Sequence, residues 1–258
     1  MIGRLAEYEV INNIDFKIFH KTYLKSRLYK INSIVSDYFF CRSRIFSHID
    51  YKSSPEEKTQ KETITIKLWD NYQIPTVQFF GFSEDQIFEK CLEDCLDYED
   101  IFSNLKNPKK ELDSFLELYT KIRSIAKKEN NPLILHSDSH LKNFLYDYER
   151  NSCVAIDPGV VLRENISFEE IDRNLLIFTL LSFNGLDIDH ELKNYYMKSF
   201  VDNVFSSQDK SNVLNLLGEK CVFEYFLVLK EFVASTIKNR KYSEKRLSKI
   251  DNLEDLLS

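Results

Sequence analysis

The stretch LILHSDSHLKNFLYDYERNSCVAIDPG, residues 133–159, decides how this chain is interpreted. Three short apolar runs within it predict strands of one small sheet: 133–135, 144–146 and 154–156. A polar loop from His136 to Asn143 joins the first two runs, and Asp157 follows the third. We therefore expect Asp138, Asn143 and Asp157 to lie side by side, at neighbouring loop ends of that sheet.

These side chains match the needs of phosphoryl transfer. In that reaction the protein mainly positions the reactants, and Mg²⁺ neutralises the charge on the phosphates. Carboxylate and amide oxygens are ligands that Mg²⁺ prefers, which makes Asn143 and Asp157 candidate metal ligands. Asp138 is placed to accept the proton of an attacking hydroxyl, or to orient that hydroxyl.

The spacing His136-x-Asp138-x4-Asn143, followed by Asp-Pro-Gly at 157–159, resembles the catalytic and metal-binding loops of the protein-kinase-like superfamily. The aminoglycoside phosphotransferase, choline kinase, lipopolysaccharide-core kinase and RIO-type branches are the most similar. This resemblance implies ATP and Mg²⁺ as cofactors and His136 as the structural histidine of the catalytic loop. It also implies Asp138 as the catalytic base, with Asn143 and Asp157 as metal ligands.

The same resemblance implies nucleotide-binding residues earlier in the chain. Lys17 lies where the family has its phosphate-binding lysine, and Glu62 lies where the family has the helix glutamate that pairs with that lysine. The backbone around Glu89 and Cys91 resembles the hinge between lobes that binds adenine. Asp172 falls where the family keeps a buried aspartate that braces the catalytic loop. For Lys17, Glu62 and Asp172, the alternative of an ordinary surface charge stays open.

Strand patterns dominate the first third of the chain. Alternating polar and apolar residues or short apolar runs predict strands there: 7–11, 15–19, 76–81 and 86–90. The sequence Ser-Pro-Glu-Glu at 54–57 predicts the start of a helix that runs to about residue 71 and buries Ile64 and Trp69.

Helix patterns dominate the remainder. Apolar residues at helical spacing predict a helix over 110–128, and everything after Glu169 is interpreted as helical. Residues 92–108 are acidic and typical of a loop. The expected fold class is α+β: a bilobal protein-kinase-like fold with a small β-rich N-terminal nucleotide-binding lobe (1–92) and a larger, mainly helical C-terminal catalytic lobe (93–258).

Departures from the family pattern bear on the acceptor. No glycine-rich loop precedes Lys17, and the 45-residue separation of Lys17 from Glu62 implies an insertion that carries a basic segment. Gly159 and Asp172 are only about a dozen residues apart, which leaves no long peptide-binding segment. His140 stands where small-molecule kinases often carry histidine. These features favour a hydroxyl of a small molecule, sugar or glycolipid as acceptor, as in the lipopolysaccharide-core kinases.

Composition and charge limit the partners and the location that we expect for the protein. A net charge of −6 and a pI near 5.5 give no general electrostatic case for nucleic-acid binding. No apolar run is long enough for a membrane span, and the first residues lack the apolar core of a signal peptide. The five cysteines are interpreted as reduced thiols. We expect a cytoplasmic protein, with a peripheral membrane contact or a protein partner left open.

Other functions stay open at this point. One is an atypical RIO-like Ser/Thr protein kinase, and another is a kinase-like binding module with weak catalysis, favoured by the missing glycine-rich loop. A third is a metal hydrolase, because His136, Asp138, His140 and Asp157 could form a transition-metal site.

Overall fold

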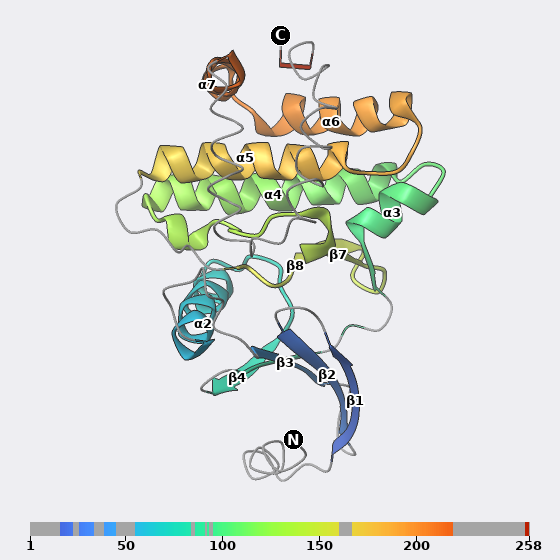
Figure 1. Cartoon of the computed structure of the whole chain (residues 1–258), viewed down its shortest axis with the longest axis vertical. Helices are drawn as coiled ribbons and strands as arrows, with labels where there is room; N and C mark the ends of the chain where they lie inside the picture. Colours follow the sequence, from blue (N-terminus) through green and yellow to red (C-terminus); the bar gives the residue numbers. More distant parts are fainter. Residues whose placement is uncertain are drawn as a thin grey trace, which may run out of the picture.

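The computed structural model describes residues 16–22, 26–33, 39–44, 55–83, 86–90, 92, 95–159, 167–218 and 256–257. The predicted strand at 7–11 and the hinge residue Cys91 lie outside the described residues. Figure 1 shows the strands of the first third of the chain at one end of the molecule, with helix 55–71 beside them, the remaining helices at the other end, and a second small sheet in between.

The first sheet has five antiparallel strands in the order β1-β2-β3-β5-β4. They are β1 (Phe16–Thr22), β2 (Ser26–Ser33), β3 (Phe39–Arg44), β4 (Phe79–Ser83) and β5 (Gln86–Lys90). β2 and β3 lie in the basic segment that the sequence suggested was an insertion, so most of that segment belongs to the first sheet. The many Lys and Arg residues there interrupt the apolar alternation on which strand prediction relies.

Helix α2 (Pro55–Asn71) begins at the proline that the sequence marks as a first helical position. It contacts β4 and β5, and its buried face is mixed, with Thr59, Glu62 and Trp69 all fully buried. Ile64, which we expected inside, is 46% exposed. Trp69 is buried as expected, but threonines and a glutamate take other inward positions, so apolar spacing alone identified only part of the buried face of α2.

The second sheet has three strands in the order β6-β7-β8 and carries the site. They are β6 (Cys95–Asp97), β7 (Phe144–Asp147) and β8 (Ser152–Ala155). The expected strand at 133–135 is instead part of a 3-10 turn, η1 (Pro132–Ile134). Asn131 caps that turn by accepting the Leu133 N–H, and Pro132 occupies its first position, so both residues favour a turn over a strand.

The stretch predicted as loop, 92–108, contains β6 and helix α3 (Tyr98–Asn104). Asp97 caps α3 by accepting the Asp100 N–H at 2.9 Å. A three-residue strand followed by a two-turn acidic helix is too short to show a clear period, which explains the missed elements.

The rest of the described chain is helical, as predicted. It contains α4 (Lys109–Glu129), α5 (Phe168–Asn184), α6 (His190–Val204) and α7 (Ser207–Gly218), which cover one side of the second sheet (Figure 1). No described helix combines the length and apolarity needed to cross a membrane. The α+β, bilobal class is confirmed.

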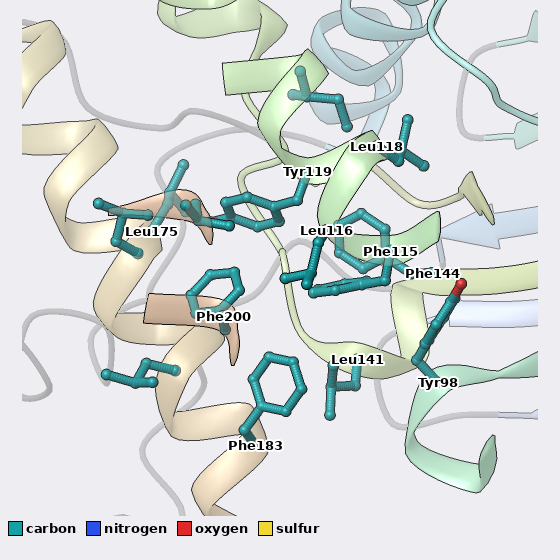
Figure 2. Packing of buried hydrophobic residues seen from close by; sticks show 14 of the residues in the cluster. Tyr98, Phe115, Leu116, Leu118, Tyr119, Leu141, Phe144, Leu175, Phe183 and Phe200 are labelled. Carbon is teal, nitrogen blue, oxygen red and sulfur yellow. The ribbon is translucent and has the colours of Figure 1, made fainter. Parts of the chain in front are cut away.

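An aromatic core lies where these helices meet the second sheet (Figure 2). Phe115 of α4 stands edge-on to Phe144 of β7 and to Phe183 of α5, with ring centroids 5.0 and 5.7 Å apart. Leu141 and Phe144 are fully buried at the end of the polar loop. The core therefore anchors the end of that loop.

Candidate active site

The polar loop from His136 to Asn143 folds back on itself around Asp138. The Asp138 carbonyl accepts hydrogen bonds from the Asn143 Nδ2 and from the His140 N–H, both at 2.8 Å. The turn η2 (Leu141–Asn143) closes the loop, with the Asn143 N–H donating to the His140 carbonyl. The Asp138 side chain keeps 45% of its surface exposed, so its carboxylate is open to a substrate.

The segment after β8 lies against this loop. The Pro158 carbonyl accepts two hydrogen bonds from Ser137, from its N–H at 2.8 Å and from its Oγ at 2.9 Å. The Ile156 N–H donates to the Asn143 carbonyl at 2.9 Å. Asp157 and Gly159 have left-handed backbones, with φ of 47° and 70°. These bonds lock the two loops together, and Asp138, Asn143 and Asp157 share one neighbourhood, as the sequence suggested.

His136 is a buried structural group in this arrangement. It is 3% exposed and packs between the rings of Trp69 and Phe144, at centroid distances of 5.3 and 4.8 Å. Its Nε2 lies 2.9 Å from the Ile156 carbonyl, so that nitrogen carries the proton and donates it. Burial, and secondarily the nearby His140, lowers the pKa of His136 to about 4. At neutral pH the ring is therefore uncharged.

His140 lies beside the open carboxylate. Its Nε2 is 3.7 Å from Asp138 Oδ2, longer than a hydrogen bond but close enough to interact when the imidazole is charged. The ring stands edge-on to Phe178 of α5 and is 34% exposed. A substrate at Asp138 would thus meet His140 as well.

The residues predicted to hold Mg²⁺ have suitable donor atoms. Asn143 uses Nδ2 to bond the Asp138 carbonyl, and the same Nδ2 lies 3.5 Å from the Asp157 carbonyl, which leaves its Oδ1 as the atom for a metal. Asp157 adds a half-buried carboxylate from the adjoining loop. Within the described ranges, no group of three or more His, Cys, Asp or Glu side chains is arranged to hold a metal ion. An oxygen pair completed by phosphates and water is the arrangement that Mg²⁺ accepts.

Of the predicted nucleotide residues, Lys17 and Glu89 lie on strands of the first sheet and Glu62 lies on helix α2. Glu62 is fully buried on α2, and Glu89 is 4% exposed on β5. Lys17 lies on β1, opposite Asn32, with β2 and β3 between its strand and β5. A pair between Lys17 and Glu62 would have to span those strands, so this pairing stays a prediction without support from the topology.

Asp172 is buried, as expected, but its recorded partner is different. Its carboxylate receives a bidentate contact from Arg123 of α4, from Nε at 2.7 Å and from Nη2 at 2.7 Å. Arg123 also binds Asp209 at 2.8 Å and donates to the Val204 carbonyl at 2.6 Å. Asp172 therefore ties helices together, and the expected hydrogen bond to the catalytic loop is not among its bonds in the described part of the chain.

Two residues that sequence reasoning missed contact the catalytic loop from α5. Thr179 lies 2.7 Å from the Ser139 Oγ, and the Ser182 Oγ accepts the Leu141 N–H at 3.0 Å. Their only signal is that both are polar in an otherwise apolar helix face.

No family model matches this sequence, and no curated protein is detectably similar to it. Solved structures are similar in fold. The RIO2 kinase from Chaetomium thermophilum aligns with a TM-score of 0.53 at 12% identity, over 84% of this chain and 76% of that one. A Plasmodium vivax ethanolamine kinase aligns with a TM-score of 0.51 at 12% identity, over 96% and 85%.

A complex of the same RIO2 kinase with ADP/Mg²⁺ and phosphoaspartate has a TM-score of 0.48 at 13% identity, and this chain spans 57% of its length. At identities this low, a structural alignment establishes the fold and does not identify the substrate. The two alignments with a TM-score above 0.5 cover 84% and 96% of this chain. The chain therefore has the protein-kinase-like fold.

Proposed function

We propose that this protein is an ATP- and Mg²⁺-dependent phosphotransferase that acts on a hydroxyl of a small molecule, sugar or glycolipid. One observation carries the proposal. An open carboxylate, Asp138, and an amide–carboxylate pair, Asn143 and Asp157, lie in two loops locked together through Ser137 and Pro158. Phosphoryl transfer needs just such a held set of oxygen groups.

Each group has a role that follows from its surroundings. Asp138 is exposed enough to accept a hydrogen bond from an acceptor hydroxyl and take its proton. Asn143 and Asp157 would hold Mg²⁺, which when bound supplies positive charge against the phosphates. His136 stays neutral and keeps the loops in register through the Ile156 carbonyl.

The acceptor is inferred from the chain around the site. Only about a dozen residues separate Gly159 from Asp172, too few for the long segment on which a peptide substrate would lie. His140 stands next to Asp138 and would contact a compact acceptor. The fold is shared with both an ethanolamine kinase and a RIO2 kinase, so a RIO-like protein kinase is the alternative.

The first test is a thermal shift with Mg²⁺-ATP on the native chain, Asp157→Asn and the matched control Asp187→Asn. Asp187 is exposed in the connection between α5 and α6, away from the site. At a hundredfold excess over the dissociation constant, ligand binding stabilises the fold by about 2.7 kcal/mol, a shift of roughly 5–10 °C. We expect that shift in the native chain and the control, and its loss in Asp157→Asn.

An ADP-release assay against a panel of sugars, amino alcohols and glycolipids then identifies the acceptor. Autophosphorylation on Ser or Thr, without any small acceptor, would favour the RIO-like alternative. The absence of a Mg²⁺-dependent shift in the native chain would reject the proposed nucleotide site.

A further inference from the structure

The face of α5 that meets the catalytic loop carries two hydroxyl side chains, Thr179 and Ser182. Thr179 is fully buried and Ser182 is 6% exposed. They sit one turn apart and contact the loop at two points, Ser139 and the Leu141 N–H. Ser139 directly follows the catalytic candidate Asp138, so its position constrains where the Asp138 carboxylate stands.

The number of hydrogen bonds that one hydroxyl can make limits the arrangement around Thr179. Its Oγ1 lies within 3.0 Å of four oxygens: the hydroxyls of Ser139 and Tyr119 and the carbonyls of Ser139 and Leu175. A hydroxyl donates one hydrogen bond and accepts two. Thr179 therefore donates to one of these four oxygens at a time, and it can accept from the neighbouring hydroxyls.

This arrangement makes Thr179 a junction between α4, α5 and the loop. Ser139 is 1% exposed, so its Oγ depends on protein partners such as Thr179 for its hydrogen bonds. One turn along, the Leu141 N–H would be a buried donor without a partner if the Ser182 Oγ at 3.0 Å were removed. Both contacts reach the loop between Asp138 and Asn143, the segment that must stay rigid for transfer.

We propose that Thr179 and Ser182 are positioning residues of the active site: α5 holds the catalytic loop through these two hydroxyls, the task that the family resemblance gave to Asp172. The effect on catalysis rests on the proposed phosphotransferase function. The effect on the loop does not, because it follows from the hydrogen bonds alone. Arg123 takes up both carboxylate oxygens of Asp172, which explains why another group is needed.

The test compares two pairs of variants. Thr179→Val removes the hydroxyl at nearly constant shape, and Thr179→Ser keeps it. Ser182→Ala removes the acceptor of a main-chain N–H, and Ser114→Ala is its matched control. Ser114 accepts the Cys153 N–H at 2.7 Å, the same kind of bond from α4 to β8, but outside the loop.

Two readouts separate positioning from general stability. Hydrogen–deuterium exchange of peptides covering residues 137–143 reports the loop without any need for activity. Mg²⁺-dependent ATP hydrolysis, measured as phosphate release, reports kcat and KM. We expect faster loop exchange and a kcat at least tenfold lower in Thr179→Val and Ser182→Ala, with KM for ATP within threefold. Thr179→Ser and Ser114→Ala should keep kcat within about twofold.

Unchanged exchange at 137–143 in Thr179→Val and Ser182→Ala would overturn the positioning role. An equal loss of kcat in Ser114→Ala would do the same, because it would show a general stability effect. If the native chain shows neither ATP hydrolysis nor a Mg²⁺-dependent thermal shift with ATP, the proposed function fails, while the exchange data still decide whether α5 holds the loop.

Discussion

Replacing Gly159 with alanine should move Asp138, the proposed catalytic base. Gly159 has a φ of 70°, a conformation that costs an L-residue roughly 1 kcal/mol. An added Cβ would lie 2.8 Å from Asp138 Cβ, 2.9 Å from Ser137 Oγ and 3.0 Å from Asp138 N. Contacts this short cannot persist, and two of the three atoms belong to the start of the Asp138 residue, where no flexible side chain can swing aside.

The expected loss of stability and of activity in Gly159→Ala follows from these contacts. Overpacking of this kind costs about 1–3 kcal/mol, so together with the backbone strain we expect a loss of roughly 2–4 kcal/mol. For a chain of this size the melting temperature should fall by about 5–15 °C. Relieving the overlap shifts Asp138 by a large fraction of an ångström, and a misplacement near 1 Å costs about a hundredfold in rate. We therefore expect kcat to fall by about 10- to 100-fold.

Two further variants separate the effect of backbone strain at Gly159 from the effect of the short contacts made by the added Cβ. Gly159→Asn keeps the Cβ but suits the left-handed backbone, so it should lose nearly as much activity as Gly159→Ala. Combining Gly159→Ala with Ser137→Ala removes one of the three short contacts and leaves both contacts to Asp138. That double variant also loses the Ser137 Oγ bond to the Pro158 carbonyl, so it should regain little of its stability and little of its kcat. Melting curves and Mg²⁺-dependent phosphate release provide both measurements.

Normal kcat in Gly159→Ala would refute the reasoning, because it would mean that the two loops tolerate a Cβ between them. Full activity in Gly159→Asn with a loss in Gly159→Ala would refute it differently, since backbone strain alone would then explain the effect.

Three other predictions concern the supporting structure. The pKa of His136 is about 4 in the folded chain and 6.5 in the unfolded chain, so the stability that the neutral ring contributes is complete above about pH 6.5 and is lost as the pH falls to 4. The difference in unfolding free energy between the native chain and His136→Gln should therefore narrow by about 3 kcal/mol over that range. A difference that stays constant with pH would contradict this prediction. Arg123→Met leaves the Asp172 carboxylate buried without its cation and should cost about 3–5 kcal/mol in urea unfolding, whereas a loss below 1 kcal/mol would show that the network is dispensable. Trp69→Phe removes the 2.7 Å bond to the Ile134 carbonyl and should cost about 1–3 kcal/mol by the same measurement, unless that carbonyl finds another donor.

Local signals in the sequence were sufficient to bring the candidate site residues together. Pro55 marks the start of α2, and the polar loop between two apolar runs places Asp138 and Asp157 near each other. The turn η1 was missed because Leu133-Ile134-Leu135 is apolar enough for a strand, and only the preceding Asn131-Pro132 pair favours a turn. Strands β2, β3 and β6 were missed because their patterns are short or interrupted by charge.

Long-range partners could not be predicted from one sequence. Arg123 and Asp172 are 49 residues apart, and Thr179 and Ser139 are 40 apart. No periodicity links such residues, because their contact depends on how whole helices pack. The expectation for Asp172 was right about burial and does not match the partner that the structure gives it.

The junction between the two sheets has a mechanical consequence. Trp69 of α2 donates to the Ile134 carbonyl, the Ala155 N–H donates to the Pro75 carbonyl, and Thr76 Oγ1 donates to the Ala155 carbonyl. These three bonds attach the end of α2 and the residues after it to the segments that lead into both catalytic loops. A rotation that opened the β-rich end as one block would break all three. An opening motion that preserves these three bonds has to pivot at this junction. The distance between the first sheet and the helical end would then increase most at β1, the strand farthest from α2.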